Sequence, residues 1–156
     1  MRRFLIFTLG EGMFAINVGY AVEVLRSIPV KHIPEVPDFI EGVIKIRGHV
    51  FPVIDMRHRF GLPGRSERTK ERILIVRSSL ERIALIVDDV IGIETISREL
   101  IEKPPVVFQG IKKRYLEGLH SRENRVYIIL NIEKILTSDE EIALQQAHSA
   151  MKGQNA

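Results

Sequence analysis

Short apolar runs recur along the chain, and turn-forming or charged residues separate them. Most runs are rich in β-branched and aromatic residues and too short for helices, so they predict β-strands. The turns Gly10-Glu11-Gly12 and Arg47-Gly48-His49 each predict a hairpin between neighbouring runs. The predicted strands cover residues 4–9, 13–18, 22–28, 42–46, 50–54, 73–76, 82–87, 92–97, 115–119 and 125–130.

The second half of the chain repeats the order of the first. Glu41-Gly42-Val43 precedes Asp55 at the same spacing as Glu117-Gly118-Leu119 precedes Asn131. Asp55 and Asn131 each open a short helical pattern, and both residue types favour helix N-caps. The repetition predicts a duplicated unit of short strands that forms two small barrels, because closing each sheet removes its exposed edges.

The expected organisation is one domain built from two subdomains that share a hydrophobic core. The subdomains are expected at about residues 1–62 and 71–136, followed by a C-terminal helix at about 138–151. Residues 61–70 are polar with glycine and proline, which predicts a linker. Ser138 and Glu141 form a capping-box pattern at the start of the helix. A thin apolar stripe follows along it, made of Leu144, Ala147 and Met151.

The composition is typical of a globular protein rather than a disordered one, with 45% hydrophobic and 28% charged residues. The chain has no cysteine, so disulfides and thiolate metal sites are excluded and nothing points to secretion. The apolar run near the amino terminus is too short for a signal-peptide core or a membrane span. We therefore expect a cytoplasmic protein. The net charge of +3 is weak support for a nucleic-acid partner, because the basic runs at 65–72 and 112–114 fit solvated loops.

Groups that could carry catalysis or bind a metal are scattered. The five histidines, at positions 32, 49, 58, 120 and 148, contain no pair at a metal-binding spacing. Asp88-Asp89 follows a predicted strand, where it is expected to begin a turn or a helix. No glycine-rich loop precedes a helix in the form that a phosphate cradle needs. We therefore expect a protein that is not an enzyme and has no metal or cofactor.

A few polar residues occupy unusual places. Strict alternation in the third predicted strand points Val22 and Val24 inward and leaves Ala21, Glu23 and Leu25 on the outer face. Arg47-Gly48 lies in a tight turn between two very apolar strands. Taken alone, these positions also fit ordinary exposed residues and a generic hairpin.

The order and spacing of these motifs, from about residue 4 to residue 136, resemble the CheW family. The family hallmark is an Asn-Leu-Arg-Gly turn followed by an apolar strand, a proline and an Asp-Leu-Arg stretch. This chain has Lys45-Ile46-Arg47-Gly48 and then Phe51-Pro52-Val53-Ile54-Asp55-Met56-Arg57. Residues 131–136, with the sequence NIEKIL, match the closing motif of the family. Lys45 and Met56 depart from the pattern, which bears on fine specificity rather than on membership.

The resemblance implies an all-β fold of two five-stranded, SH3-like β-barrels on a shared hydrophobic core, with short helices. It implies a non-catalytic adaptor without cofactors that couples chemoreceptors (methyl-accepting chemotaxis proteins) to the histidine kinase CheA. Such an adaptor is cytoplasmic and is recruited to membrane-bound receptor arrays. The resemblance places binding of the kinase's regulatory domain at Ala21, Glu23 and Leu25. It places binding of the receptor's cytoplasmic tip at Arg47, Gly48, Val50, Ala84, Val90 and Ile93, in a groove between the barrels.

Two other interpretations stay open at this point. The first is a CheW-like regulatory domain of a related kinase or of a pilus-type chemosensory system, although no phosphoacceptor or ATPase segment is present. The second is a small-barrel nucleic-acid-binding protein that uses the basic runs. Such proteins usually offer stacking aromatics, whereas aromatic residues make up only 6% of this chain and none is tryptophan. We therefore expect no nucleic-acid partner and no direct membrane insertion.

Overall fold

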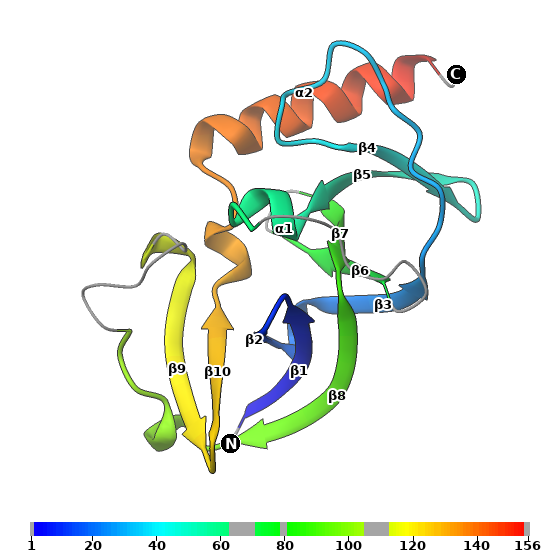
Figure 1. The fold of residues 1–156 in the computed structure, drawn as a ribbon. Coiled ribbons are helices and arrows are strands. Elements are labelled where there is room, and N and C mark those ends of the chain that lie inside the picture. The colour runs from blue at the N-terminus through cyan, green and yellow to red at the C-terminus, as the bar shows by residue number, and fades with distance from the viewer. Residues whose placement is uncertain (1, 63–70, 79–80, 105–112, 155–156) are drawn as a thin grey trace.

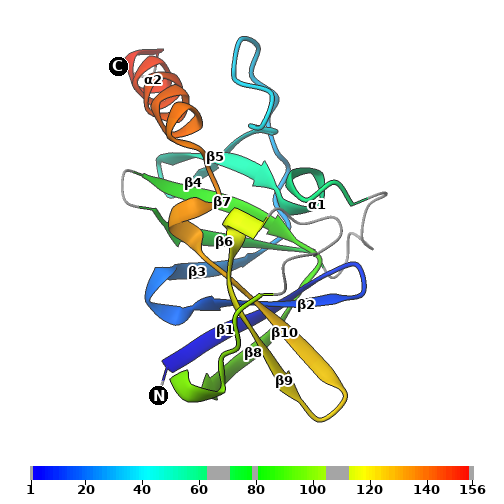
Figure 2. The ribbon, with the colours of Figure 1, turned by 90° about the vertical axis from the view of Figure 1, so that its left-hand side faces the viewer.

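The computed structural model describes residues 2–62, 71–78, 81–104 and 113–154 (Figures 1 and 2). Side chains are described up to residue 146. Most of the predicted linker and the basic run at 65–72, together with the stripe residues Ala147 and Met151, therefore lie outside this description. Within the described residues, no helix is both long and apolar enough to cross a bilayer.

The described strands form two five-stranded sheets, with the orders β8-β1-β2-β10-β9 and β3-β6-β7-β5-β4. This confirms the predicted all-β class, and Figure 1 shows the first sheet below the second. The strands are β1 (Arg2–Leu9), β2 (Gly12–Asn17), β3 (Ala21–Arg26), β4 (Gly42–Ile46), β5 (His49–Asp55), β6 (Arg72–Arg77), β7 (Arg82–Val87), β8 (Asp89–Ile96), β9 (Leu116–Arg122) and β10 (Arg125–Leu130).

Short helical segments lie between the strands and at the end of the chain. The predicted caps are confirmed: Asp55 Oδ1 accepts from the Arg57 amide and Asn131 Oδ1 from the Glu133 amide, each at 3.0 Å. The helices are α1 (Met56–Arg59) and α2 (Ser138–Gln154), and the 3-10 turns are η1 (Val18–Tyr20), η2 (Arg98–Leu100), η3 (Lys113–Tyr115) and η4 (Ile132–Lys134).

The capping box of α2 lies one residue earlier than the sequence pattern predicts. Thr137 Oγ1 accepts from the Glu140 amide at 3.0 Å, and Glu140 Oε1 accepts from the Thr137 amide at 2.8 Å. Both Nη atoms of Arg59 also donate to the Glu140 carboxylate. This tertiary contact fixes Glu140, rather than Glu141, as the residue that reaches back to the cap.

The sheets do not follow the expected boundary between residues 62 and 71. Each takes the first hairpin of one repeat, β1–β2 or β6–β7, and the three later strands of the other repeat, β8–β10 or β3–β5. The duplication is therefore present in the structure, but the two repeats exchange strands. β3 follows β2 directly after η1, and β8 follows β7 directly after Asp88, so the chain passes from one sheet into the other within a few residues.

In each sheet, one pair of bridged residues connects the two ends of the strand order, so that the sheet curls toward a closed barrel. The chain beyond β3 returns to β4 through the pair Lys31↔Val43, and the chain beyond β8 returns to β9 through Glu102↔Leu119. In both bridges a glycine comes just before the bridged strand residue. A Cβ at Gly42 would lie 2.3 Å from Lys31 O, and one at Gly118 would lie 2.8 Å from Glu102 O. We call the β1-containing sheet barrel A and the β6-containing sheet barrel B.

The hydrophobic core has three parts because the central strands are buried on both faces. Along β1, Phe4 and Ile6 pack inside barrel A, while Leu5 and Phe7 point the other way into a core shared by both barrels. Along β6, Ile73 and Ile75 pack inside barrel B, while Leu74 and Val76 point the other way into the shared core. Burial on both faces explains why these strands have continuous apolar sequences.

Candidate functional site

An exposed ion pair joins the two surfaces that the sequence analysis assigns to different partners. Glu23 lies on β3, an end strand of the hydrogen-bonded order in barrel B, and Arg47 lies in the β4–β5 turn. Arg47 Nη2 donates to Glu23 Oε2, and the two side chains are 69% and 32% exposed. One predicted kinase-binding residue and one predicted receptor-binding residue are thus in direct contact.

The backbone of the turn presents Arg47 to solvent. Arg47 has a φ of 48° and Gly48 has a φ of 83°, as in the two-residue hairpin turns whose central residues both have positive φ. The positive φ of Gly48 is one that glycine adopts readily, and a Cβ there would have no atom within 4 Å. The hydrogen bond to Glu23, and then the negative charge of Glu23, raise the pKa of Arg47 above its ordinary value. The arginine is therefore a permanent cation at the tip of barrel B.

The predicted alternation along β3 holds at Val22, which packs against the core of barrel B, but it fails for the residues on either side. Register shifts between Ala21 and Glu23, so a bulge at Val22 changes which residues share a face. Leu25 packs partly buried against the core of barrel B, and Ala21 packs against the shared core. Val24, which was expected to point inward, is 41% exposed. Two residues of the predicted outer trio, Ala21 and Leu25, therefore pack on the core. The exposed apolar side chain of this strand is that of Val24.

The predicted receptor-binding residues are divided between the two barrels. Arg47, Gly48 and Val50 lie on the β4–β5 hairpin of barrel B. Ala84, also in barrel B, is fully buried, so it can support that surface but offers no area for contact. The remaining two residues lie on β8 of barrel A, where Val90 packs partly buried on the shared core and Ile93 is 47% exposed.

One carboxylate, that of Asp88, connects the two barrels. Arg57, in α1, donates from Nε and Nη2 to Asp88 Oδ1 and Oδ2, at 2.6 Å each. The Gly10 amide, in the β1–β2 turn of barrel A, donates to Asp88 Oδ2 at 2.7 Å. The hydrogen bond from Arg57 to Asp88 raises the pKa of Arg57, against the lowering effect of burial. Asp88 lies in a one-residue bend between β7 and β8, and Asp89 begins β8, so the expectation that the pair begins a turn or a helix is wrong; the sequence also did not indicate that Asp88 binds both barrels.

The described residues contain no group of three or more histidine, cysteine, aspartate or glutamate side chains able to hold a metal ion. The buried histidine, His120, stacks on Tyr127 with ring centroids 6.1 Å apart, and its Nδ1 lies 3.2 Å from Leu100 O. This environment is that of a packed core residue. The surface around the predicted binding residues offers the ion pair of Arg47 with Glu23 and the exposed apolar side chains of Val24 and Ile93.

Two interlocked five-stranded barrels with an exposed arginine turn define an SH3-like scaffold of the two-barrel class. The CheW-like domain family matches residues 3–140. The chain belongs to the CheW family. Proteins of this family are non-catalytic scaffolds of chemotaxis signalling.

Individual relatives support this membership. The chain is 32% identical over 139 residues to the chemotaxis protein CheW of Klebsiella aerogenes, covering 89% of this chain and 84% of that protein. It is 28% identical over 122 residues to Protein PilI of Pseudomonas aeruginosa, covering 75% of this chain and 66% of that protein. The crystal structure of the scaffolding protein CheW from Thermoanaerobacter tengcongensis superposes with a TM-score of 0.81 at 32% identity, covering 89% and 90% of the two chains.

Proposed function

We propose that this protein is an adaptor that holds chemoreceptors and the histidine kinase CheA in one complex and performs no catalysis itself. The kinase's regulatory domain docks on the outer edge of barrel B, around Glu23 and Val24. The receptor's cytoplasmic tip docks beside Arg47 and reaches across to Ile93 of barrel A. The protein is cytoplasmic and is recruited to membrane-bound receptor arrays through these contacts.

The observation that carries the proposal is the ion pair between Glu23 and Arg47. An exposed ion pair adds little to stability, on the order of 0–1 kcal/mol, so its removal need not disturb the fold. When a partner's carboxylate or helix carbonyl approaches, the Arg47 guanidinium has further donors to offer. Because Glu23 and Arg47 are in contact, binding at one surface changes the charge environment of the other.

The coupling test is a reconstituted kinase assay with receptor fragments on vesicles, the kinase and this protein. Arg47→Glu is expected to weaken receptor binding by about ten- to hundredfold, because a charge-assisted hydrogen bond contributes about 1.5–3 kcal/mol. Receptor-dependent kinase phosphorylation should fall accordingly, while the melting temperature stays within a few degrees.

The chain offers a matched control for that variant. Arg122 ends β9 of barrel A, is 57% exposed, and pairs with Glu94 of β8 at 3.5 Å. Arg122→Glu therefore makes the same change of charge at the corresponding hairpin of the other barrel. It should leave receptor coupling intact, and equal losses in the two variants would contradict a specific role for Arg47.

The kinase-docking surface has its own test. Val24→Asp places an unpaired charge at an exposed apolar position, which at an interface should cost about 2–5 kcal/mol of binding energy. Calorimetric titration against the kinase's regulatory domain should show this loss, with the fold unchanged. Unchanged affinity for Val24→Asp together with Glu23→Lys would move the docking surface elsewhere.

The likeness to Protein PilI favours a second candidate function, which is the same adaptor role in a pilus-type chemosensory system. The two candidates differ in the kinase that is bound and not in the chemistry of the surface. Retention of native kinases on the immobilised protein, followed by mass spectrometry, distinguishes them.

A further inference from the structure

The short helix α1 lies at the level where the two barrels meet (Figures 1 and 2). Its first residue, Met56, is fully buried in the shared core. The other three residues, Arg57, His58 and Arg59, bind groups on different parts of the molecule. A single helical turn therefore makes contacts with both barrels.

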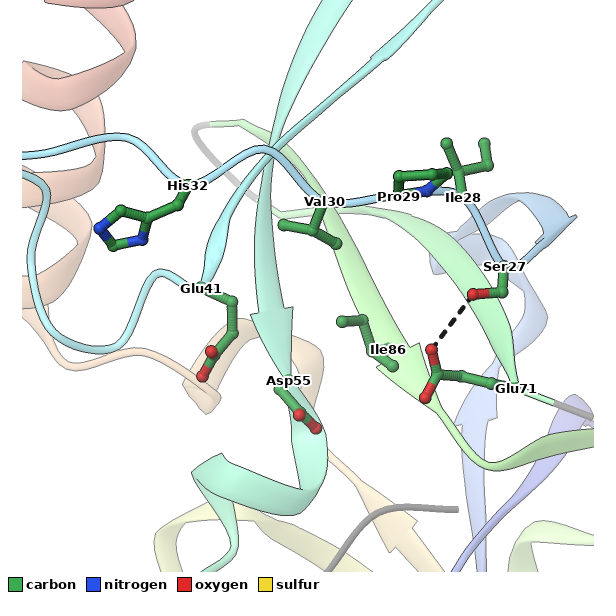
Figure 3. A pocket seen from close by; sticks show the side chains of 9 residues that line it. All are labelled: Ser27, Ile28, Pro29, Val30, His32, Glu41, Asp55, Glu71 and Ile86. Atoms are coloured by element: carbon green, nitrogen blue, oxygen red, sulfur yellow. Dashed lines mark hydrogen bonds between the residues drawn. The ribbon is translucent and has the colours of Figure 1, made fainter. Parts of the chain in front are cut away.

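On one side, α1 is anchored to barrel B, the barrel whose strand β5 continues into it. β5 ends at Asp55, whose Oδ1 accepts from the Arg57 amide at 3.0 Å. His58 Nδ1 lies 2.7 Å from Oε1 of Glu41, the residue before β4. Asp55 and Glu41 both line a pocket of about 520 Å³ on barrel B (Figure 3). The carboxylates at this end of the pocket thus hold α1 in place.

On the other side, Arg57 connects α1 to barrel A through Asp88. Arg57 Nε donates to Oδ1 and Nη2 donates to Oδ2, each at 2.6 Å, and Oδ2 also accepts from the Gly10 amide at 2.7 Å. The Asp88 amide donates to Thr8 O of β1 at 3.0 Å. Asp88 is the residue between β7 of barrel B and β8 of barrel A, so Arg57 binds where the chain crosses from one barrel to the other.

Arg59 connects α1 to segments on either side of the β9–β10 hairpin of barrel A. Its Nε and Nη2 donate to Ile135 O, after β10, at 3.2 and 3.0 Å, and its Nη1 donates to Glu140 Oε2 at 2.7 Å. Its Cζ lies 5.6 Å from the ring centroid of Tyr115, the residue before β9. The side chain of Arg59 is only 12% exposed, so these contacts surround it.

The position of α1 matters because the proposed receptor surface is divided between the barrels. Arg47 lies in the β4–β5 turn of barrel B, and Ile93 lies on β8 of barrel A. β5 leads from that turn directly into α1, and Asp88, which Arg57 binds, directly precedes β8. Two groups held in a fixed geometry act on one partner as a single surface, whereas mobile groups lose conformational freedom on binding.

We propose that α1 fixes the orientation of the two barrels, with Arg57 and Arg59 as positioning residues. They hold Arg47 and Ile93 so that both meet one receptor tip. Arginine suits this role because its planar guanidinium binds two acceptor atoms at once, as it does in both residues. The receptor part of this inference rests on the proposed function, whereas the fixed orientation of the barrels can be tested without any partner.

The first test measures the distance between the barrels by double electron–electron resonance. The chain has no cysteine, so nitroxide labels can be attached through Lys45→Cys of barrel B and Asn124→Cys of barrel A, both at exposed positions. The parent should give one narrow distance distribution. Arg57→Lys and Arg59→Lys keep the charge but lose the planar fork, so each should widen the distribution at least twofold.

Two controls separate orientation from stability. His58→Gln changes the residue between the two arginines, which is 65% exposed and bonded to barrel B, and should leave the width unchanged. Ile75→Val removes a methylene group inside barrel B and should lower the melting temperature without widening the distribution. Asp88→Asn should cause the same widening if Arg57→Lys fails to fold. An unchanged width in the folded lysine variants, or equal widening in Ile75→Val, would overturn the proposal.

The second test uses a soluble fragment of a receptor's cytoplasmic tip. In the parent, Ile93→Ala should weaken binding at least fivefold, because both barrels contact the tip. In the Arg57→Lys background the same substitution should cost less than twofold, since barrel A is no longer held beside Arg47. An equal loss in the two backgrounds would contradict the positioning role. If neither Ile93→Ala nor Arg47→Glu weakens binding in the parent, the receptor surface is wrong, and the distance measurement alone decides the role of α1.

Discussion

The two barrels have the same connectivity but present different chemistry at their hairpin tips. The β4–β5 turn of barrel B has Arg47 at a φ of 48°, and the β9–β10 turn of barrel A has Glu123 at a φ of 57°. The first turn residue therefore has a positive φ in both barrels, while its charge is reversed. In barrel B the tip residue itself pairs with the exchanged strand, whereas in barrel A Arg122, one residue earlier, makes the corresponding pair with Glu94.

This difference shows which features of the duplicated unit are required by the fold and which are free to specialise. Both repeats keep a glycine beneath the crossing backbone, an Asx cap after the last strand and an apolar strand pattern. The residues at the hairpin tips, by contrast, project into solvent and can change at little cost in stability. The proposed docking residues Glu23 and Arg47 lie in barrel B where the tip differs from that of barrel A.

The largest loss of stability is expected at Gly42 and Gly118, the glycines that both repeats place beneath the crossing backbone. Gly42→Ala places a Cβ 2.3 Å from Lys31 O at a residue with a φ of 157°, so it should reduce the free energy of unfolding by about 3–5 kcal/mol. Gly118→Ala meets Ile101 Cγ2 at 2.5 Å and Glu102 O at 2.8 Å, and should cost somewhat less because a side chain can yield. Urea denaturation followed by circular dichroism measures both variants.

Gly48→Ala is the control for those two variants. Its φ of 83° disfavours alanine, but a Cβ there has nothing within 4 Å. The expected loss is about 1 kcal/mol, from backbone conformation alone. A loss at Gly48 equal to that at Gly42 would mean that conformation, and not the crossing backbone, determines the glycine requirement.

The second prediction concerns Asp88, whose carboxylate connects the two barrels through Arg57 and the Gly10 amide. Asp88→Ala removes the carboxylate from Arg57, whose side chain is only 17% exposed, and from the Gly10 amide. The expected loss is about 2–4 kcal/mol, because a partly buried charge loses two charge-assisted hydrogen bonds. A double-mutant cycle with Arg57→Ala should give a coupling energy of about 1–3 kcal/mol. The exposed pair of Arg122 and Glu94 should give less than about 0.5 kcal/mol in the same measurement.

The third prediction tests the corrected face of β3. Leu25→Asp puts a charge against the core of barrel B and should destabilise the protein by about 2–3 kcal/mol. Val24→Asp, at the neighbouring exposed position, should change stability by less than about 0.5 kcal/mol. If thermal denaturation ranks the two variants in the opposite order, the bulge at Val22 has been placed incorrectly.

The smallest effect is expected at the junction of α2 with the barrels. Burial by itself would raise the pKa of Glu140, but the hydrogen bonds from Arg59 and from the Thr137 amide outweigh it, and the net pKa is lowered. A carboxyl whose pKa is lower in the folded state stabilises the fold at neutral pH and loses that contribution as pH falls below the ordinary value of 4.5. The stability difference between the parent and Glu140→Gln should therefore shrink at acidic pH. A difference that stays constant from neutral to acidic pH would contradict this role of Glu140.

The sequence by itself determined most of the local structure. Apolar runs located the strands, the glycine-containing turns located the hairpins, and Asp55 and Asn131 located the caps, because each depends on neighbouring residues alone. The family hallmark, from Lys45 to Arg57, also gave the class of the protein directly.

Tertiary structure decided everything that depends on pairing between distant segments. Spacing reveals that a unit is repeated, but not which repeat supplies each strand to a sheet, so the exchange of β3 and β8 was not predicted. A single bulge reversed the faces of β3 because side chains alternate with a period of two along a strand. Glu23 pairs with Arg47, and Asp88 binds Arg57 and the Gly10 amide. Each of these contacts joins residues far apart in the chain. Only folding brings those charges within reach of one another.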